Sequence, residues 1–177
     1  GSAESGNSKS YLYYQANGNF YQTSGNASYG SSWTTGDVIG VAIDMTNGGD
    51  LWFAKNNTWQ NSATASEIAA GTVTNAALAN IMSSNYDGSG MFVALGDSSA
   101  SGKGTLIFDS KGWTYSPPTG FGELTRTITG IGNFWTLNPL ASTDTLTDGN
   151  LAFTGAGNFS SYVTAPAIPI SGKWYYE

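Results

Sequence analysis

The segment between residues 35 and 60 constrains the fold more strongly than any other part of the chain. Two apolar, β-rich runs, Val38–Ile43 and Leu51–Ala54, flank Thr46–Asp50, which is rich in Asn, Gly and Asp. Gly and Asn accept the positive φ that tight turns require, and Val and Ile suit a pleated strand. The segment therefore predicts a β-hairpin. Because its first run is almost continuously apolar, we expect that strand to be covered on both faces, in the middle of a sheet or sandwich.

The composition favours one all-β domain. The chain has 177 residues, of which 24 are glycine, 10% are charged and 14% are aromatic. This composition suits short strands joined by tight turns better than helices. The absence of Cys and His excludes disulfides, Cys/His zinc sites and catalytic triads that use His. With six Lys and Arg and a net charge of −6, we expect no nucleic-acid partner. No apolar run approaches the ~20 residues of a membrane helix, so we expect no membrane partner either.

Further elements follow from local patterns along the chain. Aromatic runs on either side of Asn17–Asn19 predict a second hairpin, and residues 24–32 are predicted to form a polar loop that ends at Trp33. Ser66 with Glu67 predicts a capped helical turn over 67–70, and a second turn is predicted at 76–81. Additional strands are predicted at 91–95, 104–109, 162–165 and 173–177, and a tight Asp-Gly hairpin at 146–153.

The central hairpin resembles the middle of a SPRY domain. In that family a Gly-Asp-x-Ile-Gly strand that ends in Asp is followed by a turn and an aromatic strand that ends in Asn, as in Gly36–Asp44 and Leu51–Asn57. The resemblance implies a concanavalin-like, two-sheet antiparallel β-sandwich. It also implies a scaffold for binding, without indicating one particular ligand.

The resemblance extends over nearly the whole chain, but in a permuted order. Residues 3–121 resemble the C-terminal two-thirds of the family pattern and residues 133–177 resemble its N-terminal third, with 122–132 as the junction. Trp135–Leu140 and Gly172–Glu177 resemble segments that come first in SPRY domains of phage and bacterial structural proteins. We therefore expect a single, circularly permuted domain over residues 1–177; a cut across two tandem repeats would give the same order. Gly1-Ser2 resembles a cloning scar.

One stretch of the family pattern has no counterpart. After the Gly-Lys-Trp-Tyr-x-Glu strand the family turns and returns on another strand, and roughly a dozen such residues, or two to three strand lengths, are not found here. An unpaired strand edge above an apolar core invites pairing with a peptide or with a second copy of the chain. The resemblance thus predicts an open strand slot along Trp174, Tyr175, Tyr176 and Glu177, with self-association as one consequence.

No catalytic or metal-binding pattern emerges. Glycosidases of this fold class need two carboxylates that face one cleft, but the only glutamates are Glu4, Glu67, Glu123 and Glu177, and none has a carboxylate partner on a strand face. The aspartates lie in or beside turns without the spacing of a calcium loop. We therefore expect no enzymatic activity, no metal and no cofactor.

Aromatic residues near polar loops are the candidate ligand contacts. These are Tyr14, Tyr21, Tyr29, Trp33, Trp59 and Tyr86. Tyr and Trp beside Asn and Asp are typical of both glycan-binding and protein-binding surfaces. For each of them, packing in the core or against a turn is the competing interpretation.

Three functional hypotheses remain open. The first is a non-catalytic recognition module for a glycan or a protein, from a phage or bacterial surface protein, which would place it outside the cell or on a virion. The alternative is an engineered or split permuted scaffold that accepts a complementary β-strand, either a peptide or a second chain. The third and weakest hypothesis is a covalent Lys–Asn crosslink of the kind found in some surface β-domains.

Overall fold

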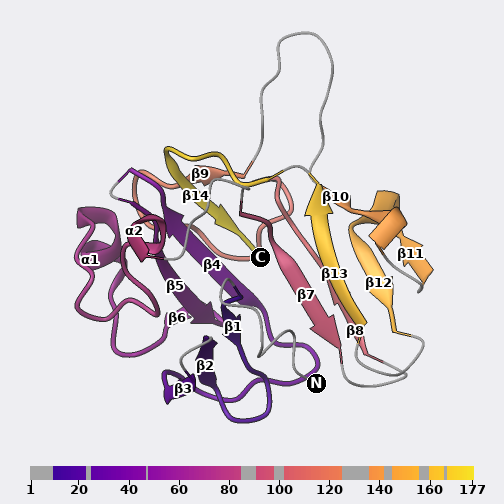
Figure 1. The fold of residues 1–177 in the computed structure, drawn as a ribbon, viewed down its shortest axis with the longest axis horizontal. Helices are drawn as coiled ribbons and strands as arrows, with labels where there is room; N and C mark the ends of the chain where they lie inside the picture. The colour runs from indigo at the N-terminus through magenta and orange to yellow at the C-terminus, as the bar shows by residue number, and fades with distance from the viewer. Residues whose placement is uncertain are drawn as a thin grey trace, which may run out of the picture.

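The computed structural model describes residues 10–22, 25–46, 48–84, 91–97, 102–124, 136–141, 145–155, 160–165 and 167–177. Short, mostly antiparallel strands dominate these residues, and they form two facing layers with a small helical excursion outside one of them (Figure 1). This arrangement confirms the expected all-β, SPRY-like sandwich. None of the described helices is long and apolar enough to cross a membrane.

The first layer is a five-stranded sheet that has the central hairpin in its interior. Its order is β6-β5-β4-β14-β9. The strands are β4 (Ile39–Asp44), β5 (Asp50–Lys55), β6 (Thr58–Trp59), β9 (Gly122–Glu123) and β14 (Lys173–Tyr176). Neighbouring strands pair antiparallel, except that β14 and β9 are parallel. The last strand of the chain therefore pairs directly with the predicted hairpin.

The turn between β4 and β5 also matches the prediction. Gly48 and Gly49 have φ of 93° and 90°, a conformation that other residues rarely adopt. The turn brings Asp44 opposite Asp50 and fixes the register of the hairpin from that pair to Ile39 opposite Lys55.

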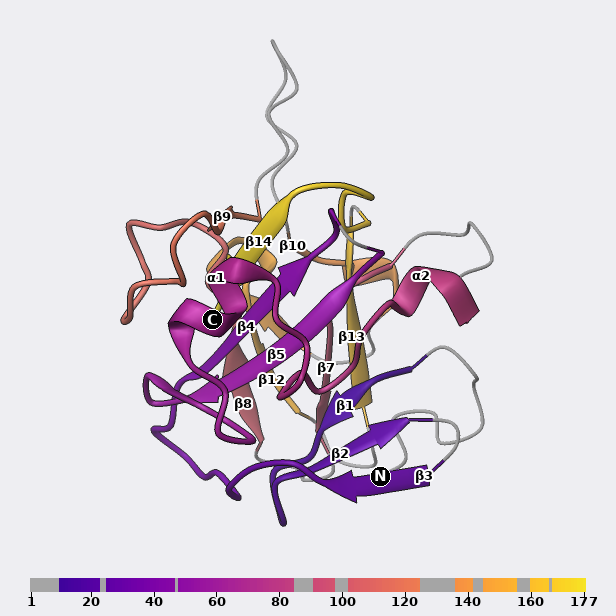
Figure 2. The ribbon, with the colours of Figure 1, turned by 90° about the vertical axis from the view of Figure 1, so that its left-hand side faces the viewer.

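Both faces of this sheet are covered, as the apolar run predicted. On the inner face, Val41 and Phe53 join the large core shared with the opposite layer. On the outer face, Ala42, Trp52 and Tyr175 form a second cluster with residues outside the sheet, among them Ile68 and Phe121. Figure 2 shows helix α1 in front of β4 and β5, and strands β7, β8, β12 and β13 behind them. Burial on two faces explains why almost every residue of β4 and β5 is apolar or small.

The helical excursion corrects two local predictions. Helix α1 (Ala65–Ala70) is capped by Thr64, not Ser66: Thr64 and Glu67 form a reciprocal capping box. The turn predicted over 76–81 is not helical, and the next helix, α2 (Ile81–Ser84), begins where that prediction ends. The reason is that residues 77 and 78 exchange backbone hydrogen bonds with Leu51 at the start of β5, so their peptide groups are unavailable to a helix.

One part of the opposite layer is a small sheet near the N-terminus with the order β1-β2-β3. The predicted hairpin is present as β1 (Leu12–Tyr13) and β2 (Asn19–Gln22). The loop predicted over residues 24–32 contains a third strand, β3 (Gly25–Ser28), which pairs with β2. Its polar, Gly-rich sequence carries little strand signal, but all four of its residues are exposed at a sheet edge, where no apolar pattern is needed.

The remaining strands complete that layer. One sheet has the order β10-β13-β7 and the other β11-β12-β8. Their bounds are Ala94–Asp97 for β7, Lys103–Thr105 for β8, Thr136–Leu137 for β10, Thr145–Thr147 for β11, Ala152–Thr154 for β12 and Ser160–Ala165 for β13, with short 3-10 helices at Pro139–Ala141 and Asp148–Asn150. Tyr13, Val93, Leu106 and Phe153 pack into the same core as β4 and β5, so the two layers share one apolar interior.

A row of charged side chains crosses the five-stranded sheet at one end. Asp50, Asp44 and Lys173 lie opposite one another on β5, β4 and β14. The Lys173 ammonium is 3.0 Å from the Asp44 carboxylate, donates to the Ala69 carbonyl at 2.9 Å and lies over the Phe121 ring. Both aspartates are buried. The ammonium therefore compensates negative charge that water cannot reach.

The two aspartates of this row differ in pKa. Burial alone would raise the pKa of Asp44, but hydrogen bonds from Thr46 and the charge of Lys173 outweigh it and hold the pKa below its usual value. Burial, together with the nearby Asp44 charge, raises the pKa of Asp50. Asp44 therefore contributes stability above its unfolded pKa, and this is lost as the pH falls through its lower folded pKa.

We expect Lys173→Met to lower the free energy of unfolding at pH 7 by about 3 kcal/mol, because it leaves the Asp44 charge buried without its cation. Urea denaturation checks this, with Lys111→Met as the control because Lys111 is an exposed lysine in a turn. A Lys173→Met protein as stable as the control would contradict a stabilising role for the pair.

Candidate functional site

The predicted strand-slot residues occupy an interior position over the described part of the chain. β14 pairs with β4 on one side, and β9 lies beside Trp174 and Tyr175 on the other. Beyond β9, Glu177 donates its N–H to the Ile107 carbonyl at 3.1 Å and accepts the Ile107 N–H at 2.6 Å. The structure therefore places backbone partners on both sides of this strand at these positions.

The Glu177 side chain anchors a neighbouring loop. Its buried carboxylate accepts the backbone N–H groups of Thr114 and Tyr115 at 2.7 and 2.9 Å and the Tyr175 hydroxyl at 3.0 Å. Trp113, next in the loop, packs edge-on against Tyr175 with ring centroids 5.0 Å apart. Burial and the nearby Glu177 charge raise the Tyr175 pKa, so its hydroxyl stays a proton donor to this carboxylate.

We expect Glu177→Gln to lower the free energy of unfolding by about 1–3 kcal/mol, because the amide loses the charge and cannot accept both N–H groups equally well. The Trp113 fluorescence should shift to longer wavelength as the loop loosens. An unchanged emission maximum and an unchanged melting temperature would show that the carboxylate does not anchor the loop.

The predicted aromatic contacts separate into different environments. Tyr29 is buried, its hydroxyl accepts the Phe53 N–H at 3.2 Å, and burial raises its pKa to about 12. It therefore packs in the core, the competing interpretation. Trp59 is half-buried on the outer face of the five-stranded sheet, 6.4 Å from the Tyr175 ring. Tyr86 lies outside the described residues.

Tyr14 and Tyr21 come together on the outer face of the small sheet. Their rings form an edge-to-face pair with centroids 5.4 Å apart, and both are half-exposed. Beside them, the Asn19 amide donates to the Asn26 side chain at 3.1 Å across β2 and β3. We call these four residues the tyrosine face. It combines flat aromatic rings with amide donors and acceptors, the groups that stack on and hydrogen-bond to polar ligands.

Trp33 belongs to a second surface, made by residues 30–38 and the adjacent turn at 56–58, which we call the loop surface. Its indole is half-buried against Tyr13, with ring centroids 6.5 Å apart, and its backbone N–H donates to the Gln15 carbonyl. The polar residues Ser31, Ser32, Thr34–Gly36 and Asn56–Thr58 are exposed around it.

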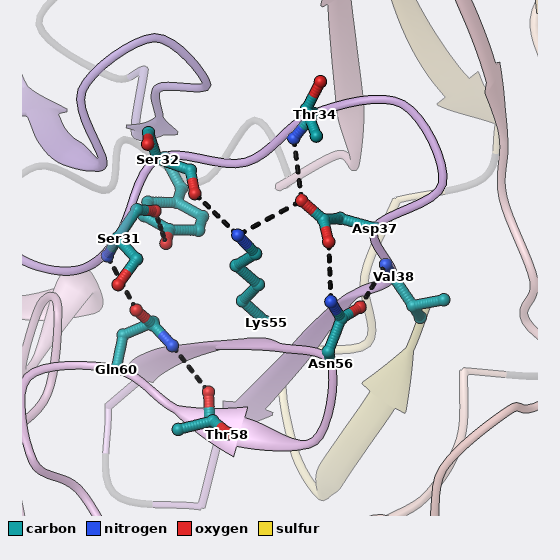
Figure 3. Close-up of polar contacts among 10 residues, drawn as sticks. Ser31, Ser32, Thr34, Asp37, Val38, Lys55, Asn56, Thr58 and Gln60 are labelled. Atoms are coloured by element: carbon teal, nitrogen blue, oxygen red, sulfur yellow. Dashed lines mark hydrogen bonds and ion pairs between the residues drawn. The ribbon is translucent and has the colours of Figure 1, made fainter.

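Side chains from the hairpin fix one end of the loop surface (Figure 3). The Asp37 carboxylate accepts the Thr34 N–H at 2.8 Å and the Asn56 amide at 2.6 Å, and Asn56 in turn accepts the Val38 N–H at 2.8 Å. The Lys55 ammonium lies 3.2 Å from Asp37. The hydrogen bonds from Thr34 and Asn56 and the Lys55 charge hold the Asp37 pKa below its usual value.

Further contacts fix the other end of the loop surface. Lys55 donates to the Ser32 carbonyl at 2.8 Å, Tyr13 donates to the Ser31 carbonyl at 2.5 Å, and the Gln60 side chain accepts the Ser31 N–H at 2.8 Å (Figure 3). A side chain at Gly30 would place its Cβ 2.5 Å from the Gln60 side-chain oxygen, so this position has no space for a residue larger than glycine. The loop surface is thus preorganised by hydrogen bonds from side chains of the strands and turns beside it.

Sequence reasoning pointed to Trp33 as a ligand contact but not to the residues that order the loop around it. Asp37, Lys55 and Asn56 are ordinary turn or strand-end residues in the sequence. A usable signal was present: in the predicted hairpin, the segment before β4 must lie beside the segment after β5, which brings Asp37 close to Asn56. Gln60 has no such signal, because its contact depends on how the distant loop crosses β6.

The polar groups of the loop surface are mostly engaged with one another or exposed to solvent. In the described part of the chain, no group of three or more acidic side chains is placed to hold a metal ion. Asp37 is engaged by Lys55, Asn56 and the loop backbone. The loop surface therefore offers exposed hydrogen-bond donors and acceptors beside the half-buried ring of Trp33.

The comparison with known families covers this same region. Residues 2–89 match the family model of the SPRY domain. The SPRY match spans the small sheet, the loop surface and the central hairpin, just under half of the chain's 177 residues. SPRY domains are general protein-interaction modules, which fits a non-catalytic binding role. No curated protein and no solved structure matches the chain.

A matched pair of tyrosine substitutions separates the core residue from the surface residue. We expect Tyr29→Ala to lower the free energy of unfolding by about 3–5 kcal/mol, because it removes a buried ring from among Tyr13, Phe20 and Phe53. Tyr21→Ala should cost about 1 kcal/mol, since its ring is half-exposed. Equal losses in chemical denaturation would mean that Tyr29 is not part of the core.

Proposed function

We propose that this chain is a non-catalytic interaction module that binds a protein partner through the loop surface. The observation that carries this proposal is that residues 30–38 are preorganised. Hydrogen bonds from the side chains of Asp37, Lys55, Asn56 and Gln60 fix the path of this loop. A loop that is already ordered loses little conformational entropy when a partner binds. The SPRY match supports the proposal because it includes the whole of this surface.

The composition of the loop surface favours a protein over other ligands. It is long and mostly polar, and it presents Ser, Thr and Asn side chains around one half-buried indole at Trp33. Protein interfaces combine an aromatic anchor with a polar rim in this way. The net charge of −6 favours partners with basic segments through long-range attraction.

The tyrosine face supports a second candidate, a glycan ligand. Tyr14 and Tyr21 present half-exposed rings, and the amides of Asn17, Asn19 and Asn26 lie around them. Aromatic rings bind the apolar faces of sugars, and amides hydrogen-bond to hydroxyl groups. A glycan would therefore contact the small sheet and leave the loop surface free.

The permuted order and the biological setting are part of the same proposal. The pairing of β14 with β4 supports a permuted domain, because it puts the last residues of the chain into the sheet of the SPRY-matched hairpin. A phage or bacterial surface protein remains our predicted source, and an engineered or split scaffold remains its alternative.

Exposed substitutions test the loop surface without disturbing its supports. We expect Thr35→Arg combined with Thr58→Arg to weaken binding at least tenfold to partners selected on the wild-type chain from a displayed library of random twelve-residue peptides. Both side chains are exposed on the loop surface, so the melting temperature should be unchanged. Biosensor affinities for the selected peptides measure the effect.

The matched control is Thr72→Arg, an exposed threonine beyond helix α1 on the other side of the hairpin. If the selected peptides bind the wild type, the double Arg variant and the Thr72→Arg control equally, the binding site lies outside the loop surface. If only a glycan array gives a signal, and Tyr21→Ala abolishes it, the tyrosine face is the site and the protein-binding proposal fails.

A further inference from the structure

Three ionisable side chains lie in one cross-strand row on the outer face of the five-stranded sheet. Asp44 is opposite Lys173 in the pairing of β4 with β14 and opposite Asp50 in the pairing of β4 with β5. Side chains that are directly opposite in an antiparallel pair lie on the same face, with Cβ atoms about 4.5–5.5 Å apart. A lysine and two aspartates therefore meet at one place, with Asp44 in the middle.

The two oxygens of the Asp44 carboxylate have different partners. Oδ1 accepts the Thr46 N–H at 2.9 Å and also accepts the Thr46 hydroxyl. Oδ2 is buried 3.0 Å from the Lys173 ammonium and makes no hydrogen bond to any other described residue. One oxygen is thus fixed by the turn after β4, whereas the other is held by the lysine alone within the described part of the chain.

The surroundings keep water away from the two carboxyl groups. Asp44 and Asp50 are 0% and 3% exposed. The Phe121 ring covers the Lys173 ammonium, with Nζ 5.5 Å from the ring centroid, and the Ala69 carbonyl accepts from Nζ at 2.9 Å. An amine and a carboxyl group fixed in this way react as an intramolecular pair, whose effective concentration far exceeds that of free reactants.

We propose that Lys173 and Asp44 condense to an amide, a covalent isopeptide link between β14 and β4, with Asp50 as the proton relay. The overall change converts the ammonium and the carboxylate into one amide and one water molecule, so neither an oxidant nor a cofactor is required. Because the partner of the lysine is an aspartate, the reaction releases water, whereas the Lys–Asn crosslink considered from the sequence would release ammonia.

Each step follows from the contacts of the atoms involved. The ammonium passes one proton to Oδ2 across the 3.0 Å contact, and the neutral Nζ attacks Cγ of Asp44. Negative charge then develops on Oδ1, where the Thr46 N–H and hydroxyl stabilise it. Asp50 gives its proton to the Oδ2 hydroxyl and takes one back from Nζ, the Cγ–Oδ2 bond breaks, and water leaves.

The environment of Asp50 suits this relay. Its burial and the nearby Asp44 charge raise its pKa, so it holds a proton more readily than an exposed aspartate does. Its Oδ1 accepts the Asn80 N–H at 2.8 Å, which fixes the orientation of the carboxyl group. Asp50 therefore combines a position opposite Asp44 with a proton to donate.

The amide product fits the hydrogen bonds that already surround the pair. Its N–H can still donate to the Ala69 carbonyl, and its oxygen can still accept the Thr46 N–H. The ion pair of Lys55 with Asp37 at 3.2 Å differs, because Lys55 lies opposite Ile39 and not in a row of carboxylates. This second pair provides an internal control.

The test follows the intact mass of the full chain over time after cell-free synthesis. We expect the wild-type mass to fall by one water molecule, while Lys173→Met keeps its full mass because it lacks the amine. Lys55→Met is the matched control and should lose the water as the wild type does. Trypsin should leave the bond after Lys173 uncut, and tandem mass spectrometry should find one branched peptide that joins residues 44 and 173.

Asp50→Asn tests the relay separately. Its amide oxygen can still accept the Asn80 N–H but the side chain cannot pass on a carboxyl proton, so we expect the loss of water to slow at least about tenfold. Circular dichroism shows whether the variant is folded, and Asp50→Glu, which restores the carboxyl group, should react faster than Asp50→Asn. If Asp50→Asn does not fold, the wild-type mass and the branched peptide still decide whether the link forms.

A wild-type chain that keeps its full mass throughout the time course would overturn the proposal. A loss of water that maps to a succinimide at an Asp-Gly step, such as Asp148-Gly149, would also overturn it. Hydroxylamine identifies that outcome, because it cleaves the chain at a succinimide and leaves a lysine amide intact. A folded Asp50→Asn chain that reacts as fast as the wild type would contradict the relay. None of these results depends on what the loop surface binds.

Discussion

The pairing of β14 with β4 is the interaction on which the rest of the structure depends. It places a strand from the last residues of the chain beside a hairpin more than a hundred residues earlier and makes that hairpin the interior of a five-stranded sheet. Two side chains secure the ends of β14: Lys173 neutralises Asp44 at one end, and Glu177 holds the loop at 113–115 at the other. Because these two charged residues lie at the two ends of β14, the same strand both completes the sheet and fixes a loop that covers the sheet's outer face.

This five-stranded sheet gives the loop surface its rigidity. The hairpin carries Lys55 and Asn56 at one end, and these side chains reach out to fix residues 30–38 as an ordered loop. A few hydrogen bonds from the end of the hairpin therefore hold the loop surface in a fixed position relative to the buried strands.

Sequence alone predicted the parts of the fold that depend on local pattern. The Thr46–Asp50 turn, the apolar run of β4 and the aromatic hairpin around Gly18 carry strong signals and are present. β3 could not be predicted, because an exposed edge strand needs no apolar alternation. Tyr29 was a candidate ligand contact, with core packing as the alternative, and its ring packs in the core, because burial depends on contacts that the local sequence does not show. For the same reason, the hydrogen bond from Gln60 to the loop surface had no sequence signature.

The most direct test of this account is native-state amide hydrogen exchange measured by NMR at neutral pH. If β14 is integral to the sheet, the Trp174 and Tyr176 amides, which face β4, should exchange as slowly as those of Gly40 and Ala42, which face β5, with an opening free energy close to that of global unfolding. Fast, local exchange of the β14 amides while β4 and β5 stay protected would contradict it. The hairpin would then fold without its C-terminal strand, and the closed five-stranded sheet would not be the basis of the structure.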